Sequence, residues 1–291
     1  VLPGPFLDRE SLVDLFGREQ VTVAAGVPTI WASLLQVLQG SYRTLHPRLR
    51  MVVGGAASSP SLVRDFEKLG IEIVVGWGMT ETSPVGTVNY LKSGIDGLDE
   101  PARHLLRSRA GIPLPLFEAR AMGPNGEVEW NGSDMGELEV RGPWVASGYF
   151  NDDSAADKWT DDGWFRTGDI ATIDPRGYVH IADRAKDLVK SGGEWISSVD
   201  LENLLLSHPA VQEAAVIGVP HPRWGERPLA IVVSRPGQSP APEELRAFMA
   251  PKVARYALPD SVVLVDALPR TSTGKVLKTR LREMYSVEEK S

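Results

Sequence analysis

Apolar and polar positions in the first eighty residues follow two alternating periods. Apolar residues recur at helical spacing in residues 11–20, 29–40 and 59–70, and they form short continuous runs in residues 21–28, 49–57 and 71–78. Short apolar runs that alternate with amphipathic helices are typical of parallel strands covered by helices. The pattern therefore predicts an α/β unit with a parallel sheet at the start of the chain.

From about Gly111 the pattern changes to short apolar segments separated by turns. Residues 116–122, 136–142 and 177–184 are typical of strands, and the GPNGE sequence at residues 123–127 is typical of a tight turn. These segments predict a small antiparallel sheet or a distorted barrel attached to the first unit. The polar residues 91–110, with mixed charge, predict a mobile surface segment.

A third pattern begins after residue 190. Residues 198–209 and 241–258 have helical spacing, and residues 210–220, 227–236 and 260–268 are typical of strands. About 100 residues of this kind suffice for an independent α+β domain. We expect the domain boundary between Asp183 and Asp187, which divides the chain into residues 1–184 and residues 185–291.

Composition limits the classes of function. The chain has 291 residues, of which 42% are hydrophobic and 24% are charged, as in ordinary globular proteins. Its 38 acidic residues outnumber its 31 basic ones, and the net charge of −7 argues against nucleic acid as a partner. No apolar run approaches the roughly 18 residues of a transmembrane segment. The chain contains no cysteine, which excludes disulfides and thiol nucleophiles and fits a cytoplasmic location.

Two predicted strands end in glycine-rich turns, VVGGAASS from Val52 and VVGWGMTETSP from Val74. Ligands collect at the carboxyl ends of parallel strands, and glycines allow a flat ring to lie against the backbone. Trp77 could stack on such a ring. Thr80 could bind a phosphate oxygen, and Glu81 is a hard ligand suited to magnesium. Ordinary turn glycines beside a surface Thr-Glu pair are the alternative.

A second candidate region spans residues 162–197. It contains Asp169 after a Thr-Gly turn, then Arg184, and then Gly192 and Gly193. An aspartate can bind a ribose diol through both carboxylate oxygens, and an arginine can add a charge-assisted contact to ribose or phosphate. A hairpin followed by a solvated charge run is the alternative, but it gives no reason for pairing Asp169 with Arg184.

The sequence ALPRTSTGKVLK near the C-terminus looks like a phosphate-binding loop around Lys275. A Walker loop needs a glycine five residues before Gly274 and a Ser or Thr directly after the lysine. Pro269 and Val276 occupy those positions. Lys275 would therefore contact a phosphate as a single mobile cation, and a basic turn that caps a helix is the alternative.

Five motifs resemble, in order and spacing, those of the adenylate-forming (AMP-binding) superfamily of acyl-CoA synthetases, luciferases and peptide-synthetase adenylation domains. They are GWGMTETSP, GWFRTGDIA, DRAKDLVKSGGEWISSVDLEN, VIGVPHPRWGERPLA and LPRTSTGKVLK. The resemblance covers essentially the whole chain and is strongest to bacterial medium- and long-chain fatty acyl-CoA synthetases. It implies an α/β fold: the C-terminal part of a large domain, with a parallel sheet, helices and a small distorted β-barrel, followed by a mobile α+β C-terminal domain.

The resemblance also implies roles for individual residues. Trp77 would stack on adenine, and Asp169 would bind both ribose hydroxyls. Thr80 would bind phosphate, and Glu81 would hold Mg²⁺. Lys275 would bridge the carboxylate substrate and the α-phosphate of ATP, so that Lys275, Thr80 and Glu81 form the catalytic set. The implied nucleotide-binding residues are Gly54, Gly55, Ala56, Gly76, Trp77, Gly78, Met79, Thr80, Asp169, Ile181 and Arg184.

Further implied roles concern the acyl chain and CoA. Lys186 falls at the hinge about which the C-terminal domain swings between half-reactions. Trp31 matches a tryptophan that gates the acyl tunnel in long-chain relatives, and Gly78 would line the same pocket. Leu116 stands where many relatives have glycine. The residues implied beside the pantetheine tunnel are Lys190, Gly192, Gly193, Glu194 and Trp195.

The implied activity is that of an ATP-dependent fatty acid–CoA ligase, which uses ATP, Mg²⁺ and CoA and releases AMP and pyrophosphate. The family's Ser/Thr/Gly-rich phosphate loop does not occur in these residues, so we expect a fragment that is inactive alone. The alternatives are a fatty acyl-AMP ligase that loads a carrier protein and a non-catalytic nucleotide-binding fragment. A homodimer and a peripheral contact with a membrane stay open.

Overall fold

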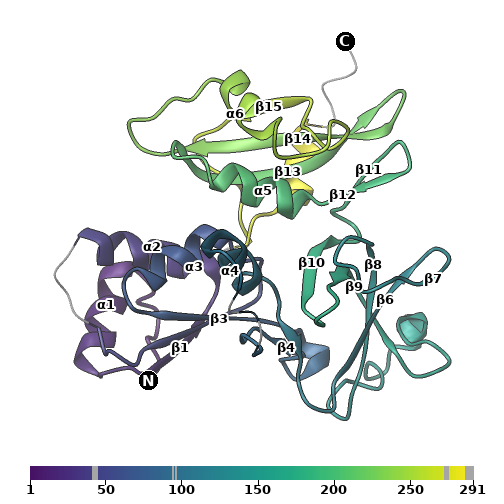
Figure 1. The fold of residues 1–291 in the computed structure, drawn as a ribbon, viewed down its shortest axis with the longest axis horizontal. Helices are drawn as coiled ribbons and strands as arrows, with labels where there is room; N and C mark the ends of the chain where they lie inside the picture. The colour runs from purple at the N-terminus through teal and green to yellow at the C-terminus, as the bar shows by residue number, and fades with distance from the viewer. Residues whose placement is uncertain (41–44, 94, 96, 272–274, 286–291) are drawn as a thin grey trace.

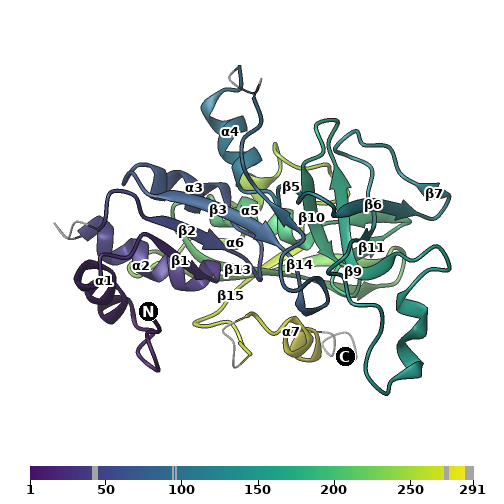
Figure 2. The ribbon, with the colours of Figure 1, turned by 90° about the horizontal axis from the view of Figure 1, so that it is seen from below.

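The computed structural model describes residues 1–291 except residues 41–44, 94, 96, 272–274 and 286–291. Its described strands form three sheets, and the third lies above the other two in Figure 1. Seen from below, the first and second sheets lie side by side (Figure 2). Among the described helices, none is both long and apolar enough to span a bilayer.

The first sheet has the strand order β1-β2-β3-β4-β5. Its strands are β1 (Val23–Gly26), β2 (Arg50–Val53), β3 (Glu72–Trp77), β4 (Thr87–Val88) and β5 (Ile112–Pro113). The first three are parallel, as predicted, whereas β4 and β5 extend the sheet in antiparallel pairing. The helices of this part are α1 (Arg9–Arg18), α2 (Pro28–Gly40), α3 (Pro60–Glu67) and α4 (Glu100–Arg107).

The helices begin where the local sequence supplies a cap. Asp8 and Asp99 accept hydrogen bonds from backbone N–H groups of the first turns of α1 and α4, and Ser59 does the same for α3. Proline follows Ser59 directly, at a helix position that needs no N–H donor. The apolar faces of α1, α2 and α3 then pack with β2 and β3 into one buried cluster. The predicted parallel sheet with covering helices is confirmed.

The prediction of a mobile segment at residues 91–110 was wrong in part, because this segment contains α4. His104 of α4 is buried, and its Nε2 lies 2.6 Å from Glu67 of α3. Arg107 also forms an ion pair with Glu67. Polar contacts with Glu67 therefore hold this helix together with Leu106, which is buried in an apolar cluster with Ile112 and Tyr178.

The second sheet is antiparallel, with the order β10-β9-β8-β6-β7. Its strands are β6 (Glu118–Gly123), β7 (Gly126–Glu127), β8 (Gly136–Arg141), β9 (Phe165–Ile173) and β10 (Val179–Arg184). The end strands β10 and β7 do not pair with each other in the described part of the chain, so the sheet is open and not a closed barrel. Two short 3-10 helices, η1 (Thr80–Thr82) and η2 (Asp153–Lys158), lie in the connections.

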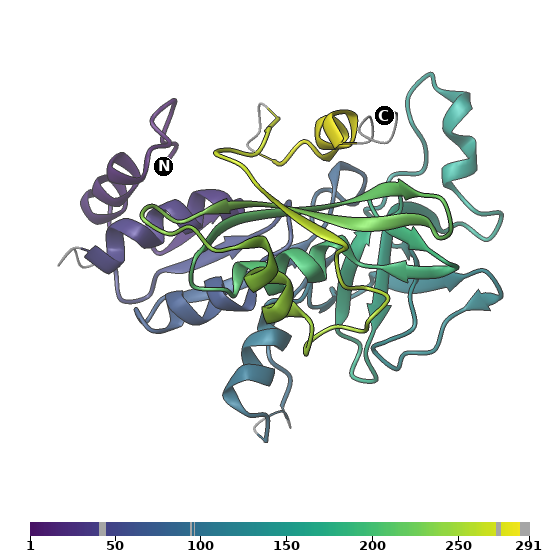
Figure 3. The same ribbon diagram turned by 90° about the horizontal axis from the view of Figure 1, so that it is seen from above.

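The third sheet has the order β12-β11-β14-β13, with β15 also paired to β14. Its strands are β11 (Val189–Ser191), β12 (Glu194–Ile196), β13 (Val211–His221), β14 (Gly225–Ser234) and β15 (Ser261–Leu264). The helices are α5 (Ser198–Leu206), α6 (Pro242–Met249) and α7 (Lys278–Tyr285). Alternate residues of β13 and β14 pack against α5 and α6 on one face and against α7 on the other (Figure 3).

The predicted helix over residues 241–258 is shorter in the structure, where α6 ends at Met249. Pro251 lacks the N–H that would continue the helical hydrogen bonds. Residues 251–258 form turns instead. Helical spacing continued past the helix because Val253, Ala257 and Leu258 still pack against the apolar cluster under α6.

Candidate functional site

The glycine-rich turns of β2 and β3 lie next to each other, because the two strands are parallel neighbours. A Cβ atom at Gly54 would lie 3.4 Å from the carbonyl oxygen of Gly76. Gly78 admits no side chain at all, since a Cβ there would lie 1.9 Å from the carbonyl oxygen of Pro84. Close approach of backbone to backbone therefore requires glycine at Gly78 and leaves little room for a side chain at Gly54.

The residues after Gly78 form a tight 3-10 turn. The backbone N–H of Met79 donates to Oγ1 of the buried Thr82 over 2.9 Å. This contact turns Thr80 outwards, where it is exposed, and leaves Glu81 partly buried. Met79 also packs with Trp77 and Ile181 against the apolar cluster of the second sheet. The turn thus joins three of the predicted nucleotide-binding residues.

Asp169 of β9 contacts residues at the ends of both β3 and β10. The indole N–H of Trp77 donates to Asp169 Oδ2 over 2.8 Å. Arg184 Nε lies 2.6 Å from Asp169 Oδ1, yet without the alignment of a hydrogen bond. Oδ1 is buried and accepts no hydrogen bond from the described residues. A ligand hydroxyl would supply the missing donor.

Burial raises the pKa of Asp169. Arg184, the Trp77 N–H and Lys275 act on this pKa in the opposite direction and do not cancel the effect of burial. Burial therefore makes ionisation of the Asp169 carboxyl group less favourable than in water. In addition, Oδ1 has no hydrogen-bond donor among the described residues. Costly buried charges of this kind are common at functional sites.

Lys275 reaches the same place from the far end of the chain. A Cβ atom at Gly55 would lie 3.9 Å from Lys275 Nζ. Thr271 and Lys275 exchange two hydrogen bonds, from Lys275 N to Thr271 Oγ1 and from Thr271 N to the Lys275 carbonyl oxygen. The loop they close presents Lys275, and residues 272–274 of the predicted motif lie outside the described residues.

Tyr149 is a contact of Glu81 that sequence reasoning missed. Its hydroxyl donates to Glu81 Oε1 over 2.5 Å, which raises the pKa of Tyr149 to about 12. The Tyr149 ring meets Trp159 edge-on, with 5.5 Å between ring centroids. Ala146 N also donates to the Glu81 carbonyl oxygen over 2.8 Å. The local sequence gave no signal that distinguished Tyr149 from its aromatic neighbours Trp144 and Phe150.

The described residues contain no group of three or more His, Cys, Asp or Glu side chains that could hold a metal ion. Glu81 offers a single carboxylate, with one oxygen already bound to Tyr149. Magnesium commonly binds proteins through one or two carboxylates together with substrate phosphates. Glu81 therefore fits Mg²⁺ only as a partner of a bound triphosphate.

Sequence comparison identifies the family. Residues 1–150 match the family described as AMP-binding enzyme, and residues 200–275 match the family described as AMP-binding enzyme C-terminal domain. The chain belongs to the AMP-binding enzyme family. The resemblance found in the five motifs is confirmed.

Two relatives of this AMP-binding protein cover nearly all of it. It is 50% identical over 288 residues to a long-chain-fatty-acid–CoA ligase of Thermus thermophilus, an alignment covering 98% of this chain and 53% of the relative. It is 47% identical over 287 residues to a 3-methylmercaptopropionyl-CoA ligase of Ruegeria pomeroyi, with the same coverage of 98% and 53%. The chain spans about half the length of these curated relatives.

The structure is similar to MatB from Rhodopseudomonas palustris. The TM-score is 0.82 against the ATP-bound crystal structure, at 34% identity over 96% of this chain and 54% of that one. It is 0.71 against the apo crystal structure, at 35% identity over 96% and 54%. The arrangement of the AMP-binding protein described here is thus more similar to the ATP-bound form.

The residues implied for CoA lie around the turn between β11 and β12. Gly192 and Gly193 both have positive φ, of 59° and 91°. A Cβ at Gly192 would lie 2.9 Å from Trp224, whereas the space beside Gly193 is open. Lys190 pairs with Trp195 across this hairpin, and Glu194 is exposed. Trp195 packs against the buried cluster of Ile170, Ala182 and Leu188, whereas Gly192 and Gly193 are exposed.

Trp31 lies in the core of the first unit. It is 2% exposed, its indole N–H donates to the Val52 carbonyl oxygen over 3.2 Å, and it packs on Gly26. A gating role for Trp31 stays a prediction. Lys186 is exposed in the connection between β10 and β11, and Ala56 is exposed after β2.

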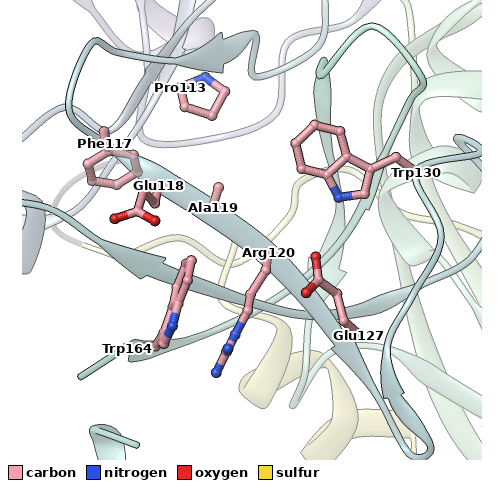
Figure 4. Close-up of a pocket in the computed structure, with 8 residues that line it drawn as sticks. All are labelled: Pro113, Phe117, Glu118, Ala119, Arg120, Glu127, Trp130 and Trp164. Atoms are coloured by element: carbon pink, nitrogen blue, oxygen red, sulfur yellow. The ribbon is translucent and has the colours of Figure 1, made fainter. Parts of the chain in front are cut away.

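A cavity of about 400 Å³ on the second sheet is separate from these residues (Figure 4). Arg120 in its wall forms ion pairs with Glu139 and Asp162, and its guanidinium lies 4.3 Å from the Trp164 ring centroid. None of the predicted site residues lines this cavity. The residues that line it are Pro113, Phe117, Glu118, Ala119, Arg120, Glu127, Trp130 and Trp164.

Proposed function

We propose that the protein carrying these residues is an acyl-CoA ligase that activates a fatty acid with ATP and then transfers the acyl group to CoA. The observation that supports this most is the meeting of Lys275 with Gly55 at the edge where Asp169 is buried. A purely structural lysine would not need to extend from another sheet to a bare glycine turn.

In the first half-reaction, a carboxylate oxygen of the fatty acid attacks the α-phosphorus of ATP, and pyrophosphate leaves. Negative charge on the two reactants opposes their approach, and Lys275 is a point cation where they would meet. It therefore stabilises the transition state more than the separated reactants. Asp169 Oδ1 would accept from a ribose hydroxyl, and Trp77 would stack on adenine.

Thr80 and Glu81 would face the phosphates from the turn after Gly78. Thr80 is exposed and can donate its hydroxyl to a phosphate oxygen. Glu81 would hold Mg²⁺ together with phosphate oxygens, and the ion would offset the negative charge of the triphosphate. Tyr149 would orient the Glu81 carboxylate through the hydrogen bond from its hydroxyl to Oε1.

In the second half-reaction, the CoA sulfur attacks the acyl carbonyl carbon, and AMP leaves. Lys275 would have to withdraw first, because it occupies the reacting position. We propose that residues 185–291 rotate about Lys186, which removes Lys275 and brings in the turn at Gly192 and Gly193. The open space beside Gly193 supports a role in admitting a narrow pantetheine chain.

The substrate is proposed to be a medium- or long-chain fatty acid. The Thermus relative is named for long-chain fatty acids and the Ruegeria relative for 3-methylmercaptopropionyl-CoA. Their sequence identities to this chain are nearly equal, at 50% and 47%, so identity alone does not select between the two substrates. Each methylene of an apolar substrate contributes only about 1–3 kcal/mol to discrimination. Chain length must therefore be measured directly.

The test is pyrophosphate release by the protein at its natural length, with ATP, Mg²⁺ and carboxylates from acetate to palmitate, with and without CoA. We expect CoA-dependent turnover that peaks at medium or long chains. Turnover with a holo-carrier protein but not with free CoA would contradict the proposed acceptor. Binding of ATP without any release of pyrophosphate would contradict the proposed reaction.

Lys275→Ala tests the mechanism. It should lower acyl-adenylate formation by at least about a hundredfold, the usual scale for losing one charge-stabilising group. It should leave thioester formation from a supplied acyl-adenylate unchanged. Lys252→Ala, which removes a lysine that lies over the Phe248 ring, is the matched control and should affect neither step. Equal loss of both steps in Lys275→Ala would refute the role.

A further inference from the structure

A chain of hydrogen bonds links the end of the second sheet to the start of α7. Asp183 of β10 accepts two hydrogen bonds through Oδ2, from Ser198 N over 2.7 Å and from Ser198 Oγ over 2.5 Å. Ser198 Oγ in turn accepts from Lys278 Nζ over 2.5 Å. Lys278 Nζ also lies 2.7 Å from Glu202 Oε1. We call Asp183, Ser198, Lys278 and Glu202 the Asp183 network.

The Asp183 network is buried, and its charges depend on one another. Asp183 is 2% exposed and Ser198 is 0% exposed. Burial raises the pKa of Asp183 and of Glu202. Burial acts to lower the pKa of Lys278, but Glu202 and Asp183 outweigh it and the pKa is raised. Removal of one member leaves the others buried and unpaired, which is costly.

The network joins the second sheet to the part of the chain that follows residues 185–188, as do the contacts of His180 with Asp200 and of Ser197 with the Ala182 carbonyl oxygen. Asp183 belongs to the second sheet, whereas Ser198 and Glu202 lie on α5, and Lys278 begins α7, beside the third sheet. Residues 185–188, which include Lys186, connect β10 to β11. Any rotation about Lys186 must therefore separate the Asp183 carboxylate from Ser198.

The network also lies close to Lys275 along the chain. Lys278 follows Lys275 by three residues, and the backbone between them is held by hydrogen bonds from Leu277 N to the Pro269 carbonyl oxygen and from Leu281 N to the Leu277 carbonyl oxygen. The contacts of Lys278 thus fix the position of the loop that carries Lys275. The same anchor is bonded, through Ser198, to the strand that carries Arg184 beside Asp169.

We propose that Asp183 is a positioning residue: through Ser198 and Lys278 it latches α5 and α7 to β10 and so holds Lys275 beside Gly55. The latch stabilises the arrangement used for adenylation and must open before thioester formation. This inference rests on the proposed two-step function and names one buried contact that must break between the two arrangements. The higher similarity to ATP-bound MatB than to apo MatB agrees with a closed latch in this structure.

Asp183→Asn in the protein at its natural length tests the latch by the ratio of the two half-reactions. We expect the rate of adenylation, divided by the rate of thioester formation from a supplied acyl-adenylate, to fall by about tenfold, which corresponds to about 1.4 kcal/mol. Ser198→Ala, which keeps the backbone donor, should shift the ratio in the same direction by less. A merely structural role would slow both half-reactions equally, and that result would overturn the latch.

Arg282→Gln is the matched control. Arg282 lies on α7 with Lys278 and is bonded to Asp187 over 2.8 Å, but Asp187 lies beyond Lys186, so this ion pair does not cross the hinge. The variant removes a similar contact of the same helix. It should leave the ratio of half-reactions unchanged, and a shift equal to that of Asp183→Asn would overturn the latch.

A second measurement needs no turnover. Because these 291 residues contain no cysteine, Lys68→Cys directly after α3 and Glu283→Cys on α7 provide sites for a donor and an acceptor dye, with any cysteine elsewhere in the natural-length protein replaced by serine. Both side chains are exposed, at 65% and 63%. Asp183→Asn should increase the population with altered energy transfer, and an unchanged distribution would overturn the latch. If the unsubstituted protein performs neither half-reaction, the proposed function fails while this comparison still decides the latch.

Discussion

At the scale of single residues, backbone conformation at Leu116 explains why glycine suits this position. Leu116 has a φ of 70°, and its side chain is 78% exposed. Left-handed backbone costs a residue with a Cβ roughly 1–2 kcal/mol. Glycine avoids that cost, which gives a physical reason for the glycine that the resemblance implies at this position.

Leu116→Gly should therefore stabilise the protein. The relief of left-handed strain exceeds the extra entropy that glycine gives the unfolded chain, roughly 0.5–1 kcal/mol, and we expect a net gain of about 0.5 kcal/mol. Leu105→Gly is the matched control, because Leu105 is 49% exposed in the helix α4 and should lose about 1 kcal/mol. Thermal unfolding of both variants checks the opposite signs, and destabilisation of both would contradict the argument.

At the scale of elements, local sequence predicted many helices and strands, and two of the departures have identifiable causes. α6 stops at Met249 because Pro251 cannot continue it. α4 was missed because its contacts with Glu67 are polar and come from another helix. The polar composition of residues 91–110 outweighed, in the prediction, the single buried face of this helix around Leu106.

Ser59→Ala tests the cap of α3. Ser59 Oγ accepts from the Leu62 N–H over 3.2 Å, and the loss of such a cap typically costs about 1 kcal/mol. We expect the midpoint of denaturant unfolding to fall accordingly. Ser59→Asp keeps an acceptor at the helix N-terminus and should retain most of the stability. An equal loss in both variants would show that the serine acts through something other than capping.

At the scale of the whole molecule, packing removes carboxyl groups such as those of Asp169 and Asp183 from contact with water. Burial raises the pKa of Asp169 above its ordinary value of 3.8. The folded state therefore takes up a proton at this group at higher pH than the unfolded state does. Above the raised pKa, the buried charge of Asp169 lowers the free energy of unfolding the most. This destabilisation decreases as pH falls from the raised pKa towards the ordinary pKa of 3.8.

Asp169→Asn should accordingly stabilise the fold near pH 7 and abolish tight ATP binding. The amide keeps an oxygen for the Trp77 N–H and carries no charge to bury. The gain in melting temperature should shrink as pH is lowered and should be absent below about pH 3.8, where the wild-type carboxyl is also neutral. Melting curves across this pH range check the sign, and a gain that grows towards low pH would contradict it.

The amino-acid sequence by itself determined the alternation of strands and helices in the first eighty residues, the glycine turns after β2 and β3, and the motifs of the AMP-binding family. Strand and helix periods, caps and tight turns are properties of neighbouring residues, so they can be found without a structure. The same local information predicted Asp169, Trp77 and Lys275 as site residues, although not their contacts.

Only the tertiary structure decided which of these residues meet. Trp77 and Asp169 are bonded across 92 positions, and Lys278 and Ser198 across 80. The bond between Tyr149 and Glu81, the approach of Lys275 to Gly55 and the openness of the second sheet likewise depend on how separate sheets pack. No local spacing encodes such contacts, because each is set by the relative placement of elements that fold from distant segments.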